Sequence, residues 1–285
     1  MKVLVTGIGG QLGYDIFNSL QSEHVDIYGV DKLRLNLSEF DKVKDYIMKL
    51  RPDVVIHCAA YTNVDLAEEN ENFCRLINVE ATANIAETCS EINAKMVYFS
   101  TDYVFSGKGD KPHEVESPTE PLSVYGHTKL AGEREVLSRL QKCFIIRTSW
   151  SYGLNGNNFV KTMLRLGQSK SVVDVVNDQF GSPTYTKDLA SLVIEMIETD
   201  KYGVYHVTNE GYCSWAELAE AIFDIAGYAT KVVPIHASEY STLATRPQNS
   251  RLSKTRLDES GFSRLPSWQD ALNRYLKELR TKGYL

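Results

Sequence analysis

Short apolar segments alternate with helical patterns from the first residue of this chain, and that alternation restricts the fold more than any other feature. Several of the apolar segments have no polar break, for example 54–56 and 144–146. Unbroken hydrophobic runs are typical of parallel strands that are covered on both faces. We predict strands at Lys2–Thr6, Asp26–Val30, 53–59, 95–100, Cys143–Thr148, 171–176 and 203–207. The pattern predicts an α/β fold with a Rossmann-like, doubly wound parallel sheet.

Helix signals lie between the predicted strands. Ser38 and Asp41 have the spacing of a capping box, apolar residues follow at helical spacing, and Pro52 ends this helix. A second long helix is predicted over 76–89, and Ser214 is expected to cap a third. The strand and helix signals together indicate right-handed βαβ crossovers.

The most distinctive local pattern follows the first predicted strand, where Gly7, Gly10 and Gly13 stand directly before a helix. Glycines at this spacing allow a tight turn, a close backbone approach to a pyrophosphate and close packing of the helix on the sheet. The phosphates would bind at the helix N-terminus. Asp31 ends the second strand, 18 residues after Gly13, where an acid can bind ribose hydroxyls; a plain turn residue is the alternative. The pattern favours a dinucleotide site.

The residues beside Asp31 bear on which dinucleotide binds. An acid at this place favours NAD(H), but Lys32 and Arg34 are able to pair with the 2′-phosphate of NADP(H). Small residues in 58–62, after the third strand, would let the backbone pass close to the cofactor. NADP(H) is the favoured cofactor and NAD(H) is the alternative.

The sequence changes character near residue 150. Residues 1–150 are predicted to form an NAD(P)-binding Rossmann domain, to which segments near 171–210 return. Beyond residue 150, loops rich in Gly, Asn, Pro and Tyr interrupt the alternation, and such loops commonly bind substrates. We expect residues 151–285 to form mainly a smaller, discontinuous α/β substrate domain.

Composition excludes several classes of partner. With 31 Lys and Arg against 37 Asp and Glu, the formal charge is −6, which disfavours nucleic-acid binding. No apolar run approaches the ~18 residues of a membrane span, and no signal-peptide pattern precedes the first strand. The five cysteines form no CxxC pair and the six histidines have no ligand spacing, so we expect a cytoplasmic protein without a metal site.

Candidate chemistry lies at the end of the fourth predicted strand and on the helix that follows. Tyr125 and Lys129 are four residues apart, so they share one helical face. A phenol with a pKa near 10 is a poor acid or base at neutral pH until a nearby cation stabilises its anion. The Lys129 ammonium can do this and can also hold the nicotinamide ribose. The Thr101 hydroxyl can contact the substrate oxygen and adjust the phenol.

This combination of glycine turn, strand-end threonine and YxxxK resembles the extended branch of the short-chain dehydrogenase/reductase superfamily. Further segments are similar to the dTDP-4-dehydrorhamnose reductase family, and the resemblance runs from the first strand to near the C-terminus. These segments are 98–105 (YFSTDYVF), 147–150 (RTSW), 157–159 (NNF), 178–184 (DQFGSPT) and 246–252 (RPQNSRL). The last three are far more specific than a glycine-rich turn.

The resemblance implies a role for each matching residue. Tyr125 would be the proton donor, Lys129 its partner and Thr101 the group that adjusts the phenol. The expected cofactor-binding residues are Gly7, Gly10, Gln11, Leu12, Gly13, Asp31, Asn36, Leu37, Ala60, Tyr61, Thr62, Tyr125 and Lys129. The expected substrate-binding residues are Thr101, Asp102, Trp150, Asn158 and Arg246. For Arg246, a purely structural role is the alternative.

Some members of the family join a dimer through Mg²⁺ held by carboxylates. Asp15 and Glu278 match two of those ligand positions, but Lys187 stands where a third carboxylate would be. Hard cations need several oxygen ligands, so a Mg²⁺-bridged dimer is in doubt. We expect no resident metal, and both a monomer and a homodimer stay open.

The function implied is NAD(P)H-dependent reduction of the C4 ketone of dTDP-4-dehydro-6-deoxy-L-mannose to dTDP-L-rhamnose, the last step of dTDP-rhamnose synthesis for cell-surface polysaccharide. One alternative is a reductase for another dTDP-6-deoxy-4-keto sugar. Another is a non-catalytic NADP-binding subunit like the regulatory subunit of methionine adenosyltransferase, against which intact Thr101, Tyr125 and Lys129 argue. A dehydratase is disfavoured because Tyr103 replaces the glutamate that should follow Asp102.

Overall fold

The computed structural model describes residues 1–21 and 25–284, and its centre is a six-stranded parallel sheet. Every neighbouring pair in this sheet is parallel. In spatial order the strands are β10 (Gly203–His206), β5 (Cys143–Thr148), β4 (Lys95–Thr101), β3 (Val54–His57), β1 (Lys2–Thr6) and β2 (Asp26–Val30). The order reverses at β1 and β3, so the carboxyl ends of these strands lie at a topological switch point, where α/β proteins bind ligands.

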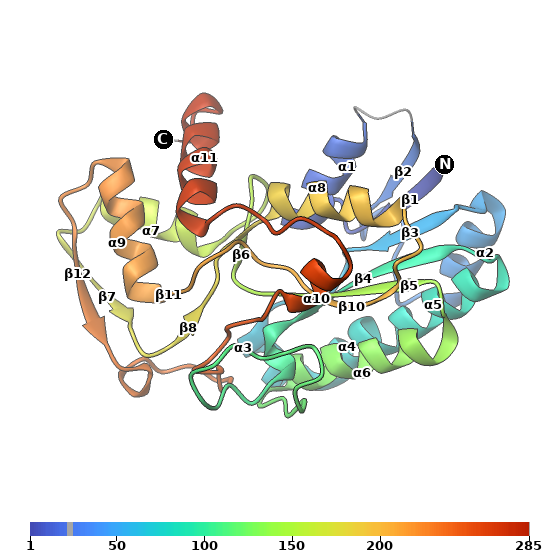
Figure 1. Ribbon diagram of the computed structural model, residues 1–285, viewed down its shortest axis with the longest axis horizontal. Helices are drawn as coiled ribbons and strands as arrows, with labels where there is room; N and C mark the ends of the chain where they lie inside the picture. The colour runs from blue at the N-terminus through green and yellow to red at the C-terminus, as the bar shows by residue number, and fades with distance from the viewer. Residues whose placement is uncertain (22–24, 285) are drawn as a thin grey trace.

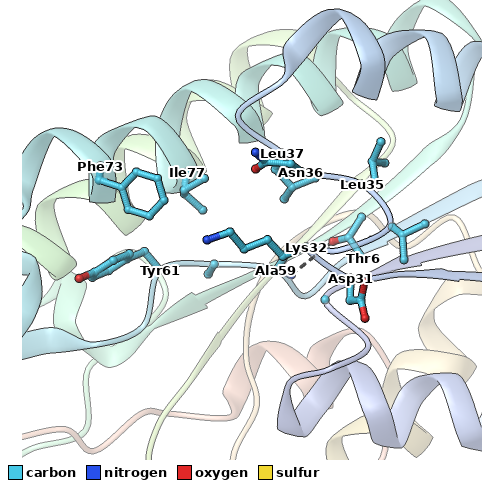
Figure 2. A pocket seen from close by; sticks show the side chains of 13 residues that line it. Thr6, Asp31, Lys32, Leu35, Asn36, Leu37, Ala59, Tyr61, Phe73 and Ile77 are labelled. Atoms are coloured by element: carbon cyan, nitrogen blue, oxygen red, sulfur yellow. Dashed lines mark hydrogen bonds between the residues drawn. The ribbon is translucent and has the colours of Figure 1, made fainter.

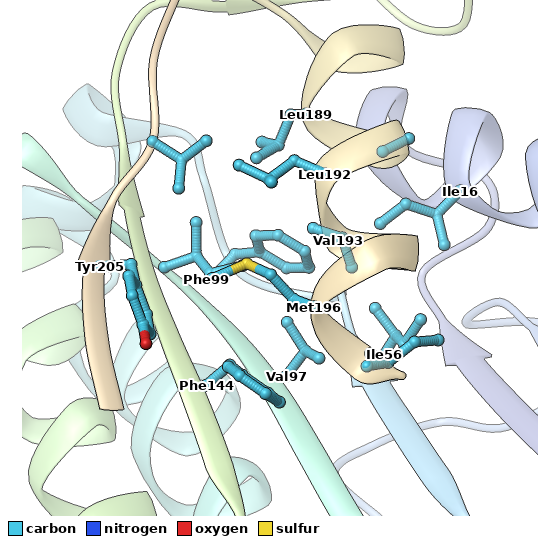
Figure 3. Close-up of a cluster of buried hydrophobic side chains, with 14 of the residues drawn as sticks. Ile16, Ile56, Val97, Phe99, Phe144, Leu189, Leu192, Val193, Met196 and Tyr205 are labelled. Carbon is cyan, nitrogen blue, oxygen red and sulfur yellow. The ribbon is translucent and has the colours of Figure 1, made fainter. Parts of the chain in front are cut away.

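Helices cover both faces of the sheet (Figure 1). On one face lie α1 (Gln11–Leu20) and α8 (Thr186–Ile197), and Figure 3 shows side chains of α8 interleaved with those of the strands. On the other face lie α2 (Phe40–Leu50), α5 (Ala81–Glu91) and α6 (Val124–Arg139). This arrangement confirms the predicted doubly wound α/β fold.

A second hydrophobic cluster lies beside the sheet (Figure 1). It is built by α7 (Phe159–Gly167), α9 (Trp215–Ala226) and α11 (Trp268–Thr281), together with β7 (Val172–Val176) and β12 (Lys231–Ile235). β7 pairs with β12 in a separate two-stranded sheet. Of the segments near 171–210, α8 and β10 therefore pack with the large sheet, whereas β7 does not.

Local capping signals have mixed outcomes. Ser214 caps α9 in a capping box with Glu217, as its sequence position predicts. The capping box predicted at Ser38 and Asp41 is wrong, because α2 begins after Glu39 and no side chain caps it. The helix predicted over 76–89 exists as a π-helical turn, η1 (Leu76–Glu80), that continues into α5.

The remaining elements are short. Two further strand pairs are β6 (Ser151–Tyr152) with β9 (Thr184–Tyr185), and β8 (Phe180–Gly181) with β11 (Cys213–Ser214). The short helices are α3 (Val64–Glu69), α4 (Glu71–Arg75), η2 (Asp102–Val104), η3 (Ala237–Glu239) and α10 (Thr255–Glu259). No helix within residues 1–21 and 25–284 has the length and apolarity needed to cross a membrane.

Candidate active site

The turn between β1 and α1 is built around close backbone contacts. Gly7 has a φ of +72°, and a Cβ added to it would lie 2.7 Å from the Ala59 backbone nitrogen. A Cβ on Gly13 would lie 2.3 Å from the Gly7 carbonyl oxygen. These contacts hold the first turn of α1 against β1 and β3. The N–H groups of that turn, including those of Gln11 and Leu12, lack intrahelical acceptors and are suited to a phosphate.

Next to this turn is a cavity of about 320 Å³ at the carboxyl ends of β1, β2 and β3 (Figure 2). Six of the predicted cofactor residues line it, namely Gly7, Asp31, Asn36, Leu37, Ala60 and Tyr61. The other seven are not among its lining residues, namely Gly10, Gln11, Leu12, Gly13, Thr62, Tyr125 and Lys129. Phe73 and Ile77 also line the cavity, and they were not predicted from the sequence because their helical segment shows no cofactor motif.

Asp31 and Arg34, near one end of this cavity, are hydrogen-bonded to the backbone, whereas the Lys32 side chain makes no such bond in the part of the chain that the structure describes. Asp31 Oδ1 accepts hydrogen bonds from the backbone N–H groups of Leu33 and Arg34, both at 3.0 Å. The Arg34 guanidinium donates to the Gly29 carbonyl at 3.4 Å. Lys32, in contrast, extends toward Tyr61 and Phe73, with its Nζ 5.7 Å from the Phe73 ring centroid (Figure 2). Lys32 therefore presents a cation to the cavity.

Thr101 and Asp102 lie at the carboxyl end of β4, where the strand passes into η2. Thr101 Oγ1 donates to Asp102 Oδ1 at 2.9 Å and accepts from the Tyr103 N–H at 3.2 Å. Asp102 is only 2% exposed. Burial raises the pKa of its carboxyl to about 6, against the opposing effect of the Ser250 and Thr101 hydroxyls.

Tyr125 lies in the first turn of α6, which Ser123 caps by accepting a hydrogen bond from the Gly126 N–H. Burial and the neighbouring Asp102 carboxyl raise the pKa of the Tyr125 phenol, and a hydrogen bond with Thr101 opposes this. The structure thus brings Thr101, Asp102 and Tyr125 together. Tyr125 is held in its protonated form, which is the form that a proton donor requires.

Lys129 lies one helical turn beyond Tyr125 and is 3% exposed. Its Nζ is 4.0 Å from the centroid of the Tyr98 ring, and the Tyr98 hydroxyl donates to the Lys129 carbonyl at 3.2 Å. Burial lowers the pKa of this ammonium to about 7, and the Glu133 carboxylate opposes that shift. The charge on Lys129 is therefore sensitive to its neighbours near neutral pH.

On the side of the second cluster, Trp150 is positioned by its backbone and by stacking. It has a φ of +48°, which is uncommon for a residue with a side chain. Its indole stacks on Trp215 with ring centroids 3.6 Å apart, and a Cβ added to Gly181 would lie 2.8 Å from it. Backbone outliers that the surroundings hold in place are typical of functional sites.

Arg246 and Asn158 are engaged by other protein groups. The Arg246 guanidinium makes a bidentate ion pair with Asp65, at 2.7 and 3.2 Å. The Asn158 amide donates to Gln11 Oε1 and to the Tyr275 hydroxyl, and its oxygen caps α7. The Asn158 side chain thus caps α7 and bonds to α1 and α11, and its contact with substrate stays a prediction.

The Gln11 side chain is also engaged within the protein. Its side-chain oxygen accepts from the Gly153 N–H at 2.9 Å as well as from Asn158. The side chain thereby connects the glycine turn to the second cluster. Its backbone N–H is the group left for a phosphate.

The residues that would hold Mg²⁺ do not fit a divalent cation. Lys187 Nζ lies 3.3 Å from Glu278 Oε1, so an ammonium is already paired with one of the two carboxylates. Asp15 is hydrogen-bonded to Thr186, and burial raises the pKa of its carboxyl to about 6. Within the described part of the chain, no group of three or more His, Cys, Asp or Glu side chains is placed to bind a metal.

Comparisons with known proteins agree with this geometry. Residues 1–281 match the family described as RmlD substrate binding domain. A dTDP-4-dehydrorhamnose reductase of Aggregatibacter actinomycetemcomitans is 39% identical over 284 residues, covering 95% of this chain and 97% of that protein. The spore coat polysaccharide biosynthesis protein SpsK of Bacillus subtilis is 40% identical over 277 residues, covering 97% of each chain.

Solved structures give the same result. The dTDP-4-dehydrorhamnose reductase of Bacillus anthracis, determined in complex with NADP, is 42% identical with a TM-score of 0.95, covering 97% of this chain and 99% of that one. The corresponding protein of Clostridium acetobutylicum is 38% identical with a TM-score of 0.96, covering 98% and 100%. A UDP-glucose 4-epimerase of Thermus thermophilus, 21% identical with a TM-score of 0.85, shares the fold.

Fold and relatives define an NAD(P)H-dependent oxidoreductase of the short-chain dehydrogenase/reductase class. Within that class, the chain belongs to the dTDP-4-dehydrorhamnose reductase family, which also carries the RmlD description.

Proposed function

We propose that this protein reduces the C4 ketone of dTDP-4-dehydro-6-deoxy-L-mannose to dTDP-L-rhamnose with NADPH. The observation that carries the proposal is the cluster of Thr101, Tyr125 and Lys129 beside a dinucleotide cavity, in a chain of this family. NADPH, when bound, supplies the hydride that adds to the sugar C4.

The protein's part in the reaction is to bind the sugar and deliver a proton. Tyr125 Oη donates its proton to the carbonyl oxygen as the hydride arrives, so that the C=O bond becomes CH–OH and the tyrosine becomes a phenolate. The Lys129 ammonium stabilises that phenolate and holds the nicotinamide ribose. The Thr101 hydroxyl, which donates to Asp102 in the structure, would turn its one proton to the substrate oxygen and would accept a hydrogen bond from the Tyr125 phenol whenever that phenol is protonated and not donating to the substrate. Tyr125 then regains a proton from solvent.

NADPH is proposed over NADH because of the charges at the adenosine end. One Asp31 oxygen is occupied by two backbone N–H groups, which weakens its use as a ribose acceptor. Lys32 lines the cavity, and its ammonium would be able to pair with a 2′-phosphate. The NADP bound in the Bacillus anthracis relative supports the same preference.

The sugar nucleotide is proposed to bind between the large sheet and the second cluster. Asp102 and Trp150 would contact it, and Arg246 would meet a phosphate by exchanging its Asp65 partner for the substrate. On this proposal the second cluster is the core of a substrate domain. The described cysteines are free thiols, which supports the cytoplasm as its compartment. A monomer and a homodimer both fit this site.

The test is the consumption of NADPH by the purified protein when dTDP-4-dehydro-6-deoxy-L-mannose is added, followed by absorbance and by identification of the sugar product. Tyr125→Phe should lower kcat by about a thousandfold, the size expected for a lost general acid. Tyr14→Phe, in α1, is the matched control and should retain activity. If the product is the talose epimer, the protein is a reductase that makes a different dTDP-6-deoxy sugar. NADPH binding without any turnover would favour a regulatory subunit.

A further inference from the structure

A buried ion pair lies behind the proposed catalytic residues. Arg147 on β5 donates from Nε to Glu133 Oε1 at 2.9 Å and from Nη2 to Oε2 at 2.8 Å, and its Nη1 donates to the Val115 carbonyl at 3.0 Å. The side chains are 6% and 2% exposed. Buried ion pairs contribute little net stability because desolvation offsets their attraction. Stability alone is therefore a poor explanation for this pair.

Its position on α6 suggests a second purpose. Glu133 follows Lys129 by four residues, and Lys129 follows Tyr125 by four, so the three side chains lie along one face of the helix. That face rests directly on β4, because a Cβ added to Gly132 would lie 2.3 Å from the Tyr98 hydroxyl. The Arg147 fork fixes the turn of α6 that follows Lys129.

The groups that face Lys129 come from four elements or their ends. They are His57 and Cys58 at the end of β3, Cys74 on α4, Tyr98 on β4 and Glu133 on α6, and Tyr125 lies one helical turn before Lys129 on the same face of α6. Burial raises the pKa of both thiols and of the two phenols and lowers that of His57 to about 3, so these five groups are neutral at pH 7. Of the six, Glu133 alone supplies a negative charge.

We propose that Glu133, held by Arg147, is a positioning residue that keeps the Lys129 ammonium charged and directed toward Tyr125 and the cofactor. The inference rests on the proposed function. Burial brings the pKa of Lys129 down to about 7 while Glu133 opposes the shift, so the ammonium has little margin at neutral pH. Without the carboxylate, Lys129 becomes largely neutral there, and both the ribose contact and the support of the phenolate are lost.

The experiment is a pair of pH profiles for Glu133→Gln, one of NADPH affinity measured by fluorescence titration and one of kcat/KM. In the parent protein, NADPH affinity and kcat/KM should both fall as the pH rises through the pKa of Lys129. In the variant this fall should move to lower pH by about one unit, the size expected for a removed neighbouring charge. Glu135→Gln is the matched control on the same helix, since Glu135 pairs with Arg139 near the surface and should leave both profiles unchanged.

Glu133→Gln leaves the buried Arg147 guanidinium without a counter-charge, which is destabilising in itself, so a second variant is needed. The double variant E133Q/R147M removes both charges and keeps the volume. The pH at which its NADPH affinity and its kcat/KM fall should be lower than in the parent protein and higher than in Glu133→Gln.

Thermal unfolding will show whether each of the two variants is folded. If NADPH affinity and kcat/KM in a folded variant fall at the same pH as in the parent protein, the role of Glu133 is purely structural and the inference is overturned. If the parent protein binds NADPH but reduces no keto sugar, the proposed function fails, and the NADPH profile still decides the role of Glu133.

Discussion

The two sides of the site are built in different ways. On the dinucleotide side, backbone turns at the ends of β1 and β2 shape the cavity, and its key contacts involve backbone atoms of these turns and of Ala59 after β3. On the sugar side, side chains from distant segments hold one another, as with Arg246 and Asp65, which are 181 residues apart. Where backbone atoms are in close contact, as at Gly7 and Gly13, there is no room for an added atom, whereas side chains that hold one another can exchange partners. We expect the first to be rigid and the second to rearrange when substrate binds.

The strongest test of that contrast is Gly13→Ala in the glycine turn. The new Cβ would lie 2.3 Å from the Gly7 carbonyl oxygen, so the helix must move. We expect a loss of about 3 kcal/mol in the free energy of unfolding, well above the ~1 kcal/mol that alanine gains in helix propensity. Chemical unfolding measures the loss, and NADPH titration should show weakened binding.

Gly9→Ala is the control in the same turn, because the nearest atom to its Cβ would be Asp31 Cβ at 3.9 Å. It should change the stability by no more than about 0.5 kcal/mol. Equal losses in the two variants would contradict the view that backbone contact at Gly13 shapes the dinucleotide side.

Asp102 stands where the two sides meet, and its burial predicts a pH-dependent stability. Its pKa is raised from the ordinary 3.8 to about 6, so the folded protein binds a proton that the unfolded chain releases between those values. Stability attributable to this group is therefore highest below pH 4 and falls as the pH rises toward 6 and above. The fall should amount to about 2 to 3 kcal/mol.

Asp102→Asn should remove this part of the pH dependence, which urea unfolding at a series of pH values will measure. Asp41→Asn, at the exposed start of α2, is the control and should leave the dependence intact. A parent protein whose stability does not fall between pH 4 and 6 relative to Asp102→Asn would show that Asp102 is ionised and well paired.

The contrast between the two sides also explains how much the sequence could predict. The glycine turn and the Ser214 cap are local, and their residue types follow from backbone geometry within a few positions. The YxxxK pair is likewise local to one helix. For Asn158 and the Gln11 side chain, hydrogen-bond partners up to 147 residues away decide the role, and no spacing rule names them.

β7 shows the same limit for the fold. The apolar run at 171–176 correctly predicts a strand, yet the strand pairs with β12 outside the large sheet. Its burial alternates, with Asp174 exposed, whereas every residue of β5 is buried. In the sequence, the only sign of a half-exposed strand was Asp174, a charged residue inside the apolar run. The identity of its partner depends on long-range packing and could not be read from the segment.

Lys32 offers a sharper test on the dinucleotide side. If its ammonium binds the 2′-phosphate, Lys32→Ala should raise KM for NADPH by roughly tenfold to a hundredfold, the range expected for a lost charge-assisted hydrogen bond. KM for NADH should stay within about twofold, because NADH has no such phosphate. Lys42→Ala, which affects an exposed lysine paired with Glu39, is the control. If KM rises equally for NADPH and NADH, Lys32 shapes the cavity but does not bind the 2′-phosphate.

The smallest effect is expected at Asp65 and Arg246 on the sugar side. Their ion pair is partly exposed, with side-chain exposures of 36% and 26%, so a double-mutant cycle of Asp65→Asn and Arg246→Met should give a coupling energy of about 0.5 to 1 kcal/mol. Because the Arg246 hydrogen bond lowers the pKa of Asp65, this contribution is present at neutral pH and is lost as pH falls through the lowered pKa.

The two single variants should separate clearly in their kinetics. Arg246→Met removes the cation proposed to meet a substrate phosphate and should raise KM for the sugar nucleotide about tenfold. Asp65→Asn removes the carboxylate that competes with that phosphate, so KM should stay the same or fall. If both variants raise KM to the same extent, the pair serves only to hold the 237–250 segment against α3, and the sugar side is as fixed as the dinucleotide side. If KM rises in Arg246→Met and falls in Asp65→Asn, Arg246 exchanges Asp65 for the substrate phosphate when the sugar nucleotide binds.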